Sequence, residues 1–117
     1  MKFLMTYQQN PNAAPPTPEH MQKIGEFTMK NIQAGIVKMT GGLVRPTKGI
    51  QLECKGGKMS VIDGPFVETK ELIDGFALVE VASREEAVRV ASEFMQLAGD
   101  GVGEILQVFD MGEGQPR

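Results

Sequence analysis

Polar side chains that could carry acid–base chemistry gather in one short segment of the chain, positions 63–71. Asp63 opens the segment, and Glu68, Thr69 and Lys70 follow it closely. Asp63 is a candidate general acid or base if the fold places it beside a substrate, or else it accepts hydrogen bonds from the backbone of its own turn. Lys70 would neutralise an anionic ligand or pair with Asp63. Glu68 and Thr69 are candidate ligand contacts, and the alternative for the whole run is a solvated loop.

Three residues inside this segment are expected to shape it rather than to react. Gly64 can adopt a positive φ and Pro65 has a fixed φ, so the pair predicts a sharp turn. Phe66 is expected to anchor the segment in the core or at a dimer seam.

Three further side chains outside the segment are candidates for the site. Tyr7 is expected at the end of the first strand, where it would contact a ligand or close an edge of the core. His20 is expected in the first turn of a helix, where it caps the surface or acts as an acid–base partner of Asp63. Arg45 belongs to a loop and would meet either an anion or solvent.

Composition argues against several classes of function. The chain has one cysteine, Cys54, and one histidine, so neither a metal site nor an intrachain disulfide is expected, and no cofactor motif is found. The formal net charge of −3 gives no reason to expect a nucleic-acid partner. The first residues form too short an apolar run for a signal peptide or a membrane span, and a cytoplasmic location is expected.

Periodicity and turn residues predict eight elements that must position these side chains. Thr17-Pro18 and Ser83 open helices that end at Gly35 and Gly99. The first helix is expected to bury Met21, Ile24, Phe27, Thr28 and Ile32. Strands are expected at 2–7, 36–40, 50–54, 59–61, 76–81 and about 104–109, with Gly56-Gly57 turning a hairpin.

This order predicts one α+β domain over residues 1–117, with a frayed tail at 110–117. Two helices on one face of an antiparallel sheet make a ferredoxin-like fold, here with an extra β-hairpin. The strands 2–7 and 76–81 carry apolar side chains on both faces, and two helices cover only one of them. A second copy laid sheet on sheet is the simplest cover, so a homodimer with a small-molecule cavity between the sheets is expected.

The segment Asp63-Gly64-Pro65-Phe66-Val67-Glu68-Thr69-Lys70-Glu71 resembles the DGPF group of YCII-related proteins. The resemblance extends over nearly the whole chain, through Ile73-Asp74-Gly75-Phe76 downstream and Gly41-Gly42-Leu43 upstream. It implies a dimeric α+β barrel in which two ferredoxin-like sheets face each other. Members are mostly uncharacterised, and some lie beside genes for alternative sigma factors, which implies a regulatory or stress-associated role. Related proteins are suggested to be enzymes with a His–Asp pair, of which Asp63 is the counterpart here.

Three functions remain open from the sequence. The first is a dimeric module that binds a small molecule or a regulatory partner. The second is a cofactor-free enzyme that uses Asp63 with Tyr7, His20 or Lys70. The third is a purely structural or assembly role.

Overall fold

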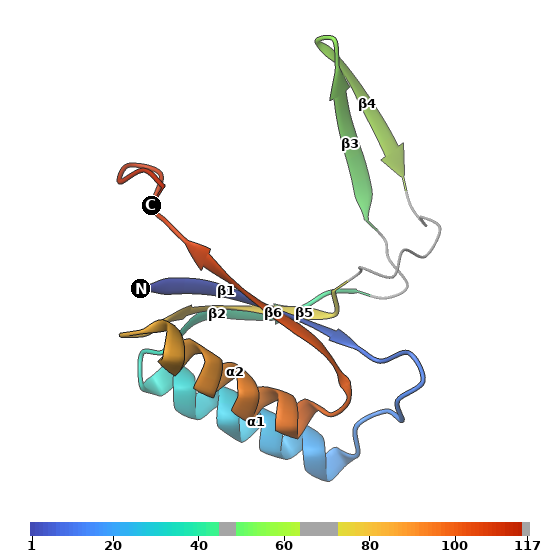
Figure 1. Ribbon diagram of the computed structural model, residues 1–117. Helices are drawn as coiled ribbons and strands as arrows, with labels where there is room; N and C mark the ends of the chain where they lie inside the picture. Colours follow the sequence, from blue (N-terminus) through green and yellow to red (C-terminus); the bar gives the residue numbers. More distant parts are fainter. Residues whose placement is uncertain (45–48, 64–72, 116–117) are drawn as a thin grey trace.

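The described part of the chain folds into two helices and six strands (Figure 1). The computed structural model describes residues 1–44, 49–63 and 73–115, with Asp63 described by its backbone alone. The strands are β1 (Lys2–Gln9), β2 (Val37–Gly42), β3 (Ile50–Lys55), β4 (Lys58–Asp63), β5 (Gly75–Glu80) and β6 (Gly101–Val108). The helices are α1 (Pro18–Gln33) and α2 (Arg84–Ala98).

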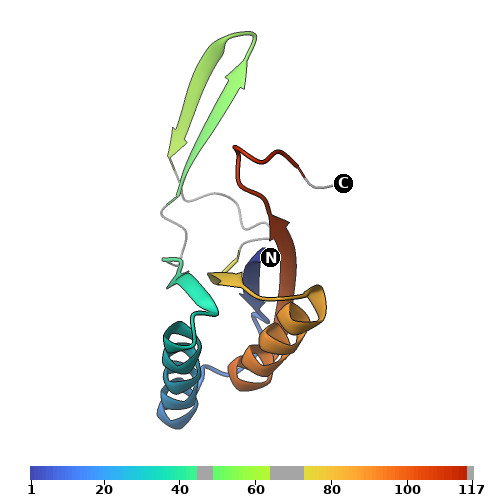
Figure 2. The ribbon, with the colours of Figure 1, turned by 90° about the vertical axis from the view of Figure 1, so that its left-hand side faces the viewer.

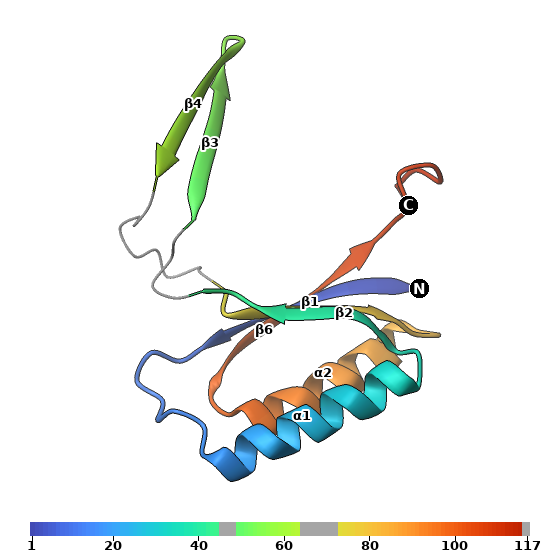
Figure 3. The same cartoon turned by 180° about the vertical axis from the view of Figure 1, so that it is seen from behind.

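Four of the strands form an antiparallel sheet in the order β2-β5-β1-β6. Both helices lie side by side against one face of this sheet, and none of the described residues forms a helix on the opposite face (Figures 1 and 3). This arrangement confirms the expected α+β, ferredoxin-like fold.

Side-chain caps start both helices where the sequence predicts. The Thr17 hydroxyl accepts a hydrogen bond from the N–H of His20 (3.2 Å), and Pro18 occupies the first turn, where a missing N–H costs nothing. The Ser83 hydroxyl likewise accepts from the N–H of Glu86 (3.1 Å). The Glu86 carboxylate reaches back to the N–H of Ala82 (3.2 Å), one residue earlier than in the usual capping box.

The core lies between the sheet and the helices. Phe3 and Val79 are opposite each other on β1 and β5, and both point towards the helices. Val37 on β2, Val81 directly after β5 and Ala87 on α2 complete the cluster. Each fully buried valine side chain contributes about 1.5–3 kcal/mol to folding.

The prediction of which α1 residues face the core is partly wrong. Ile24, Phe27 and Thr28 are half-buried, but Met21 and Ile32 are exposed. The buried position is Asn31, whose amide donates to the carbonyl of Phe27 (2.8 Å). Because its amide is hydrogen-bonded, Asn31 can be buried without an unsatisfied polar group, whereas its neighbour Ile32 and the more distant Met21 face water.

The hairpin β3–β4 stands away from the body of the molecule, on the side of the sheet that the helices leave open (Figures 1 and 2). Gly56 and Gly57 form its turn with φ values of 59° and 80°, which confirms the predicted two-residue connection. The projecting hairpin gives the chain a radius of gyration of 16.5 Å. A compact domain of this length would have roughly 13 Å.

Candidate functional site

The uncovered face of the sheet is built from alternate residues of each strand. Leu4 on β1 lies between Leu78 on β5 and Leu106 on β6, and Met39 on β2 continues the row beside Leu78. Leu106 is 51% exposed and Met39 is 60% exposed, while Leu4 and Leu78 are half-buried by their neighbours. Four apolar side chains therefore form a continuous row across the sheet, open to solvent in a single chain.

A hollow of about 320 Å³ adjoins this row where β1 ends. It is lined by Thr6, Gln8, Ile73, Val102 and Glu104. The strand register explains the set, because Thr6 is paired with Glu104 and Gln8 with Val102 on the same face. The hollow thus combines two apolar side chains, Ile73 and Val102, with a hydroxyl, an amide and a carboxylate, so that its lining is mainly polar.

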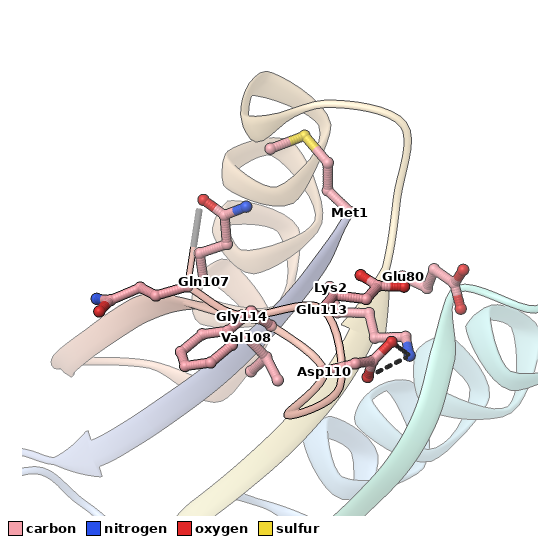
Figure 4. A pocket seen from close by; sticks show the side chains of 10 residues that line it. Met1, Lys2, Glu80, Gln107, Val108, Asp110, Glu113 and Gly114 are labelled. Carbon is pink, nitrogen blue, oxygen red and sulfur yellow. Dashed lines mark hydrogen bonds and ion pairs between the residues drawn. The ribbon is translucent and has the colours of Figure 1, made fainter. Parts of the chain in front are cut away.

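A second hollow, of about 400 Å³, lies at the other end of the same face (Figure 4). Lys2 crosses it and binds the Asp110 carboxylate, with Nζ 3.1 Å from Oδ1. The hydrogen bond and charge of Asp110 raise the pKa of Lys2 above its usual range. The lysine charge is therefore already neutralised, and the other charged residues of the rim, Glu80 and Glu113, are acidic. The salt bridge fastens the turn after β6 to the start of β1.

Tyr7 lies on the opposite, helix-covered side of the sheet. Its hydroxyl donates to the carbonyl oxygens of Gly99 (3.1 Å) and Asp100 (3.2 Å), and its ring packs edge-on against Phe94. Burial, and then the charges of Asp74 and Asp100, raise the pKa of the phenol above its usual range. This geometry matches the core-edge role, and a ligand contact by Tyr7 stays a prediction.

Asp74 is a structural residue that the sequence reasoning missed. Its Oδ2 accepts a hydrogen bond from the N–H of Gln9 (2.6 Å), its backbone N–H donates to the carbonyl of Tyr7, and its carbonyl accepts from the N–H of Leu43. One residue therefore joins the ends of β1 and β2 beside the hollow. An aspartate directly before a strand-opening glycine, as in Asp74-Gly75, is the signal that could have pointed to it.

The two residues of the proposed acid–base pair lie on different elements. His20 belongs to α1, below the sheet, and its ring Nδ1 lies 3.2 Å from the Thr17 hydroxyl at the helix start. Asp63 ends β4, in the hairpin above the sheet (Figure 1). Within one chain the described parts of these elements do not pack together; His20 is exposed in the first turn of α1, and its role stays a prediction.

Most of the remaining site candidates lie outside the described residues. These are Arg45, Gly64, Pro65, Phe66, Glu68, Thr69 and Lys70. The side chain of Asp63 is also outside what the structure describes, so the DGPF assignment and the enzymatic alternative that depends on Asp63 stay predictions.

The described residues also bear on metals and membranes. Across 1–44, 49–62 and 73–115, no three side chains of His, Cys, Asp or Glu lie close enough together to hold a metal ion. Neither of the two helices is long and apolar enough to cross a membrane.

Comparisons with known proteins match both a family model and a relative. The family model of the YCII-related domain matches residues 1–112. An uncharacterised protein of Rhizobium meliloti (strain 1021), R00369, is 36% identical over 73 residues, which is 62% of this chain. The matched part covers 59% of that relative's length, so the chain spans about three-fifths of it.

Proposed function

This chain belongs to the family of YCII-related domains, and we propose that it works as a homodimer that binds a small molecule between two apposed sheets. The observation that carries the proposal is the uncovered sheet face, where an apolar row adjoins a hollow with convergent polar groups.

The surface area of the single chain supports a covering partner. The chain exposes 8997 Å² to solvent. A folded monomer of 12.7 kDa is expected to expose about 6,200 Å². A stable interface takes about 800 Å² from each partner, so the surplus is more than enough for one.

The energetics favour sheet-on-sheet contact. Covering about 400 Å² of apolar sheet surface stabilises a complex by on the order of 10 kcal/mol before the cost of association is subtracted. A second copy presents the same row of Leu4, Leu78 and Leu106, so an isologous dimer covers both faces at once.

A second sheet would also close the hollow over its polar groups. Glu104 would then supply a carboxylate, and Thr6 and Gln8 a hydroxyl and an amide, inside a chamber whose apolar walls are Ile73, Val102 and the adjoining leucine row. A matching ligand is a small, mostly apolar molecule that carries a hydrogen-bond donor or an amino group for Glu104.

The dimer is tested by light scattering with two adjacent variants of β6. Leu106→Lys places a charge on the uncovered face and is expected to give a monomer. Gln107→Lys places the same charge one residue further, and strand alternation turns that position to the other face, so this variant is expected to remain dimeric. A monomeric wild-type protein would end the dimer proposal.

Ligand binding is tested by thermal shift against a library of small amines and amides. A ligand of the folded state raises the melting temperature by mass action, by an amount that grows with its concentration. Glu104→Gln keeps the size of the side chain and removes its charge, so binding of the amines should weaken by about tenfold or more. A library without any stabilising compound, or compounds that bind Glu104→Gln equally well, would count against this chamber.

A further inference from the structure

The hairpin β3–β4 has one apolar and one polar face. The register pairs Leu52 with Val61 and Cys54 with Met59, and it puts Ile50, which is paired with the last strand residue Asp63, on the same side. The opposite side carries mainly polar residues: Gln51, Glu53, Lys55, Lys58 and Ser60, together with Ile62. The apolar face is open to solvent in the single chain, with Leu52 63% and Val61 64% exposed.

An isolated hairpin with such a face needs a partner. Among the described elements, β3 and β4 have their substantial packing contacts only with each other. A two-stranded hairpin on its own is marginally stable at best in water, and burial of one face against another surface is what makes it persist. The alternation of apolar and polar residues is thus that of a strand pair with one covered face.

We propose that the β3–β4 hairpin is an arm that clasps a second copy of this chain, with its apolar face against the partner. The inference rests on the proposed dimer and adds a contact to it that the sheet faces alone do not require. The arm rises on the side of the sheet where that second copy would lie (Figures 1 and 2).

The length of the arm fits this role. Each arm strand has six residues, which span about 20 Å, whereas two sheets packed face to face are about 10 Å apart. An arm that starts at the rim of the interface therefore extends beyond the partner's sheet and lies along the side of the partner. Two-fold symmetry makes the contact reciprocal, so each protomer gives one arm and receives one.

The area that a stable dimer needs also indicates that the arm packs against a second copy of the chain. A face of four strands with six to eight residues each measures roughly 450 Å² from strand spacing and rise. The arm adds roughly 200 Å². The sheet alone is well short of the roughly 800 Å² per partner of a standard interface, and the arm supplies much of the difference.

The single cysteine provides a direct test, because Cys54 lies on the apolar face of the arm and is exposed in the isolated chain. Iodoacetamide is added to the native wild-type protein and to the chain unfolded in urea, and alkylation is followed by mass spectrometry. Burial against the partner should slow alkylation of the native dimer by about tenfold or more, since a covered thiol is shielded from the reagent. If Cys54 in the native dimer is alkylated at a rate within about fivefold of that in the unfolded chain, the arm is contradicted and the dimer is not.

Matched variants of neighbouring arm positions give the second test. Leu52→Lys puts a charge on the apolar face and should weaken dimerisation by about tenfold or more, as expected for loss of a buried interface side chain. Gln51→Lys puts the same charge on the opposite face and should change the dimer dissociation constant by less than about twofold. Equal effects of the two variants contradict the arm. A wild-type protein that is monomeric at all concentrations removes both the dimer and the arm and points to a different protein as the partner.

Discussion

The hydroxyl of Tyr7 lies 3.1 Å from the carbonyl oxygen of Gly99 and so joins β1 to the end of α2. Gly99 ends that helix with a φ of 98°, and its carbonyl is one of those left without a partner inside the helix. The Tyr7 ring also packs edge-on against Phe94, with centroids 5.5 Å apart and an interplanar angle of 84°. The tyrosine thus holds one end of the helical layer on the sheet.

Removing the hydroxyl should weaken this attachment. Tyr7→Phe keeps the ring and loses the hydrogen bonds to Gly99 and Asp100, so the free energy of unfolding should fall by about 0.5–1.5 kcal/mol. Tyr7→Leu loses the aromatic pair with Phe94 as well and should cost a further 0.5–1.5 kcal/mol or so. The stability of both variants is measured by urea denaturation followed by circular dichroism. If Tyr7→Phe leaves the free energy of unfolding unchanged, the hydroxyl gains no more from these carbonyls than from water.

The ionisation of Tyr7 can be followed by absorbance without overlap from other tyrosine or tryptophan residues, because the chain has one tyrosine and no tryptophan. Burial, together with the charges of Asp74 and Asp100, raises the phenol pKa above the ordinary value of 10.0. The fold therefore favours the protonated form, and the stability that this gives is complete below pH 10 and is lost as the pH rises through the higher folded-state pKa.

Phenolate absorbance, titrated in the native protein and in urea, measures the difference between the two states. The native midpoint should lie at the higher pH. Coincident midpoints would mean that the Tyr7 ring is as hydrated in the fold as in the unfolded chain.

Glycine at position 101 should be essential for the packing around Tyr7. A Cβ added there would lie 2.5 Å from the carbonyl oxygen of Gln8 and 2.7 Å from the Tyr7 hydroxyl. Since one of these neighbours is backbone, Gly101→Ala is expected to lower the free energy of unfolding by about 1–3 kcal/mol.

Gly25 is the matched control for that substitution. It lies on the exposed side of α1 with no atom within 4 Å of an added Cβ, so Gly25→Ala should raise the free energy of unfolding by about 0.5–1 kcal/mol. Denaturation midpoints compare the two variants, and a tolerated Gly101→Ala would mean that β6 can shift away from β1.

The extent to which the sequence predicts this fold depends on how local each feature is. The Thr17 and Ser83 caps and the Gly56-Gly57 turn are decided by neighbouring residues, and all three are confirmed. The alternation of Phe76 to Val81 also gives the correct faces, with Val79 and Val81 buried.

Features that depend on pairing between distant segments could not be predicted in the same way. Gln8 and Gln9 read as loop residues, but they extend β1 because Val102 and Gly101 lie opposite them. Glu104 reaches the hollow only through its register with Thr6, which lies far away in the sequence. The inner face of α1 was misjudged for a related reason, since hydrophobicity alone does not reveal that the Asn31 amide is satisfied by its own helix.

Asp74 should stabilise the fold and oppose the ionisation of Tyr7. Asp74→Asn removes the charged acceptor of the Gln9 N–H, and a hydrogen bond to a charged group of this kind contributes about 1.5–3 kcal/mol. The same change removes one of the charges that raise the Tyr7 pKa, so the native phenolate midpoint should move towards its value in urea.

Asp110→Asn is the control with the same chemical change. Its carboxylate forms the Lys2 ion pair at the surface, where solvent screening leaves such a pair little effect on stability, and Asp110 is not among the groups that raise the Tyr7 pKa. The control should leave the phenolate midpoint in place. If the two variants shifted the midpoint equally, the effect would reflect the net charge of the protein rather than the position of Asp74 beside β1.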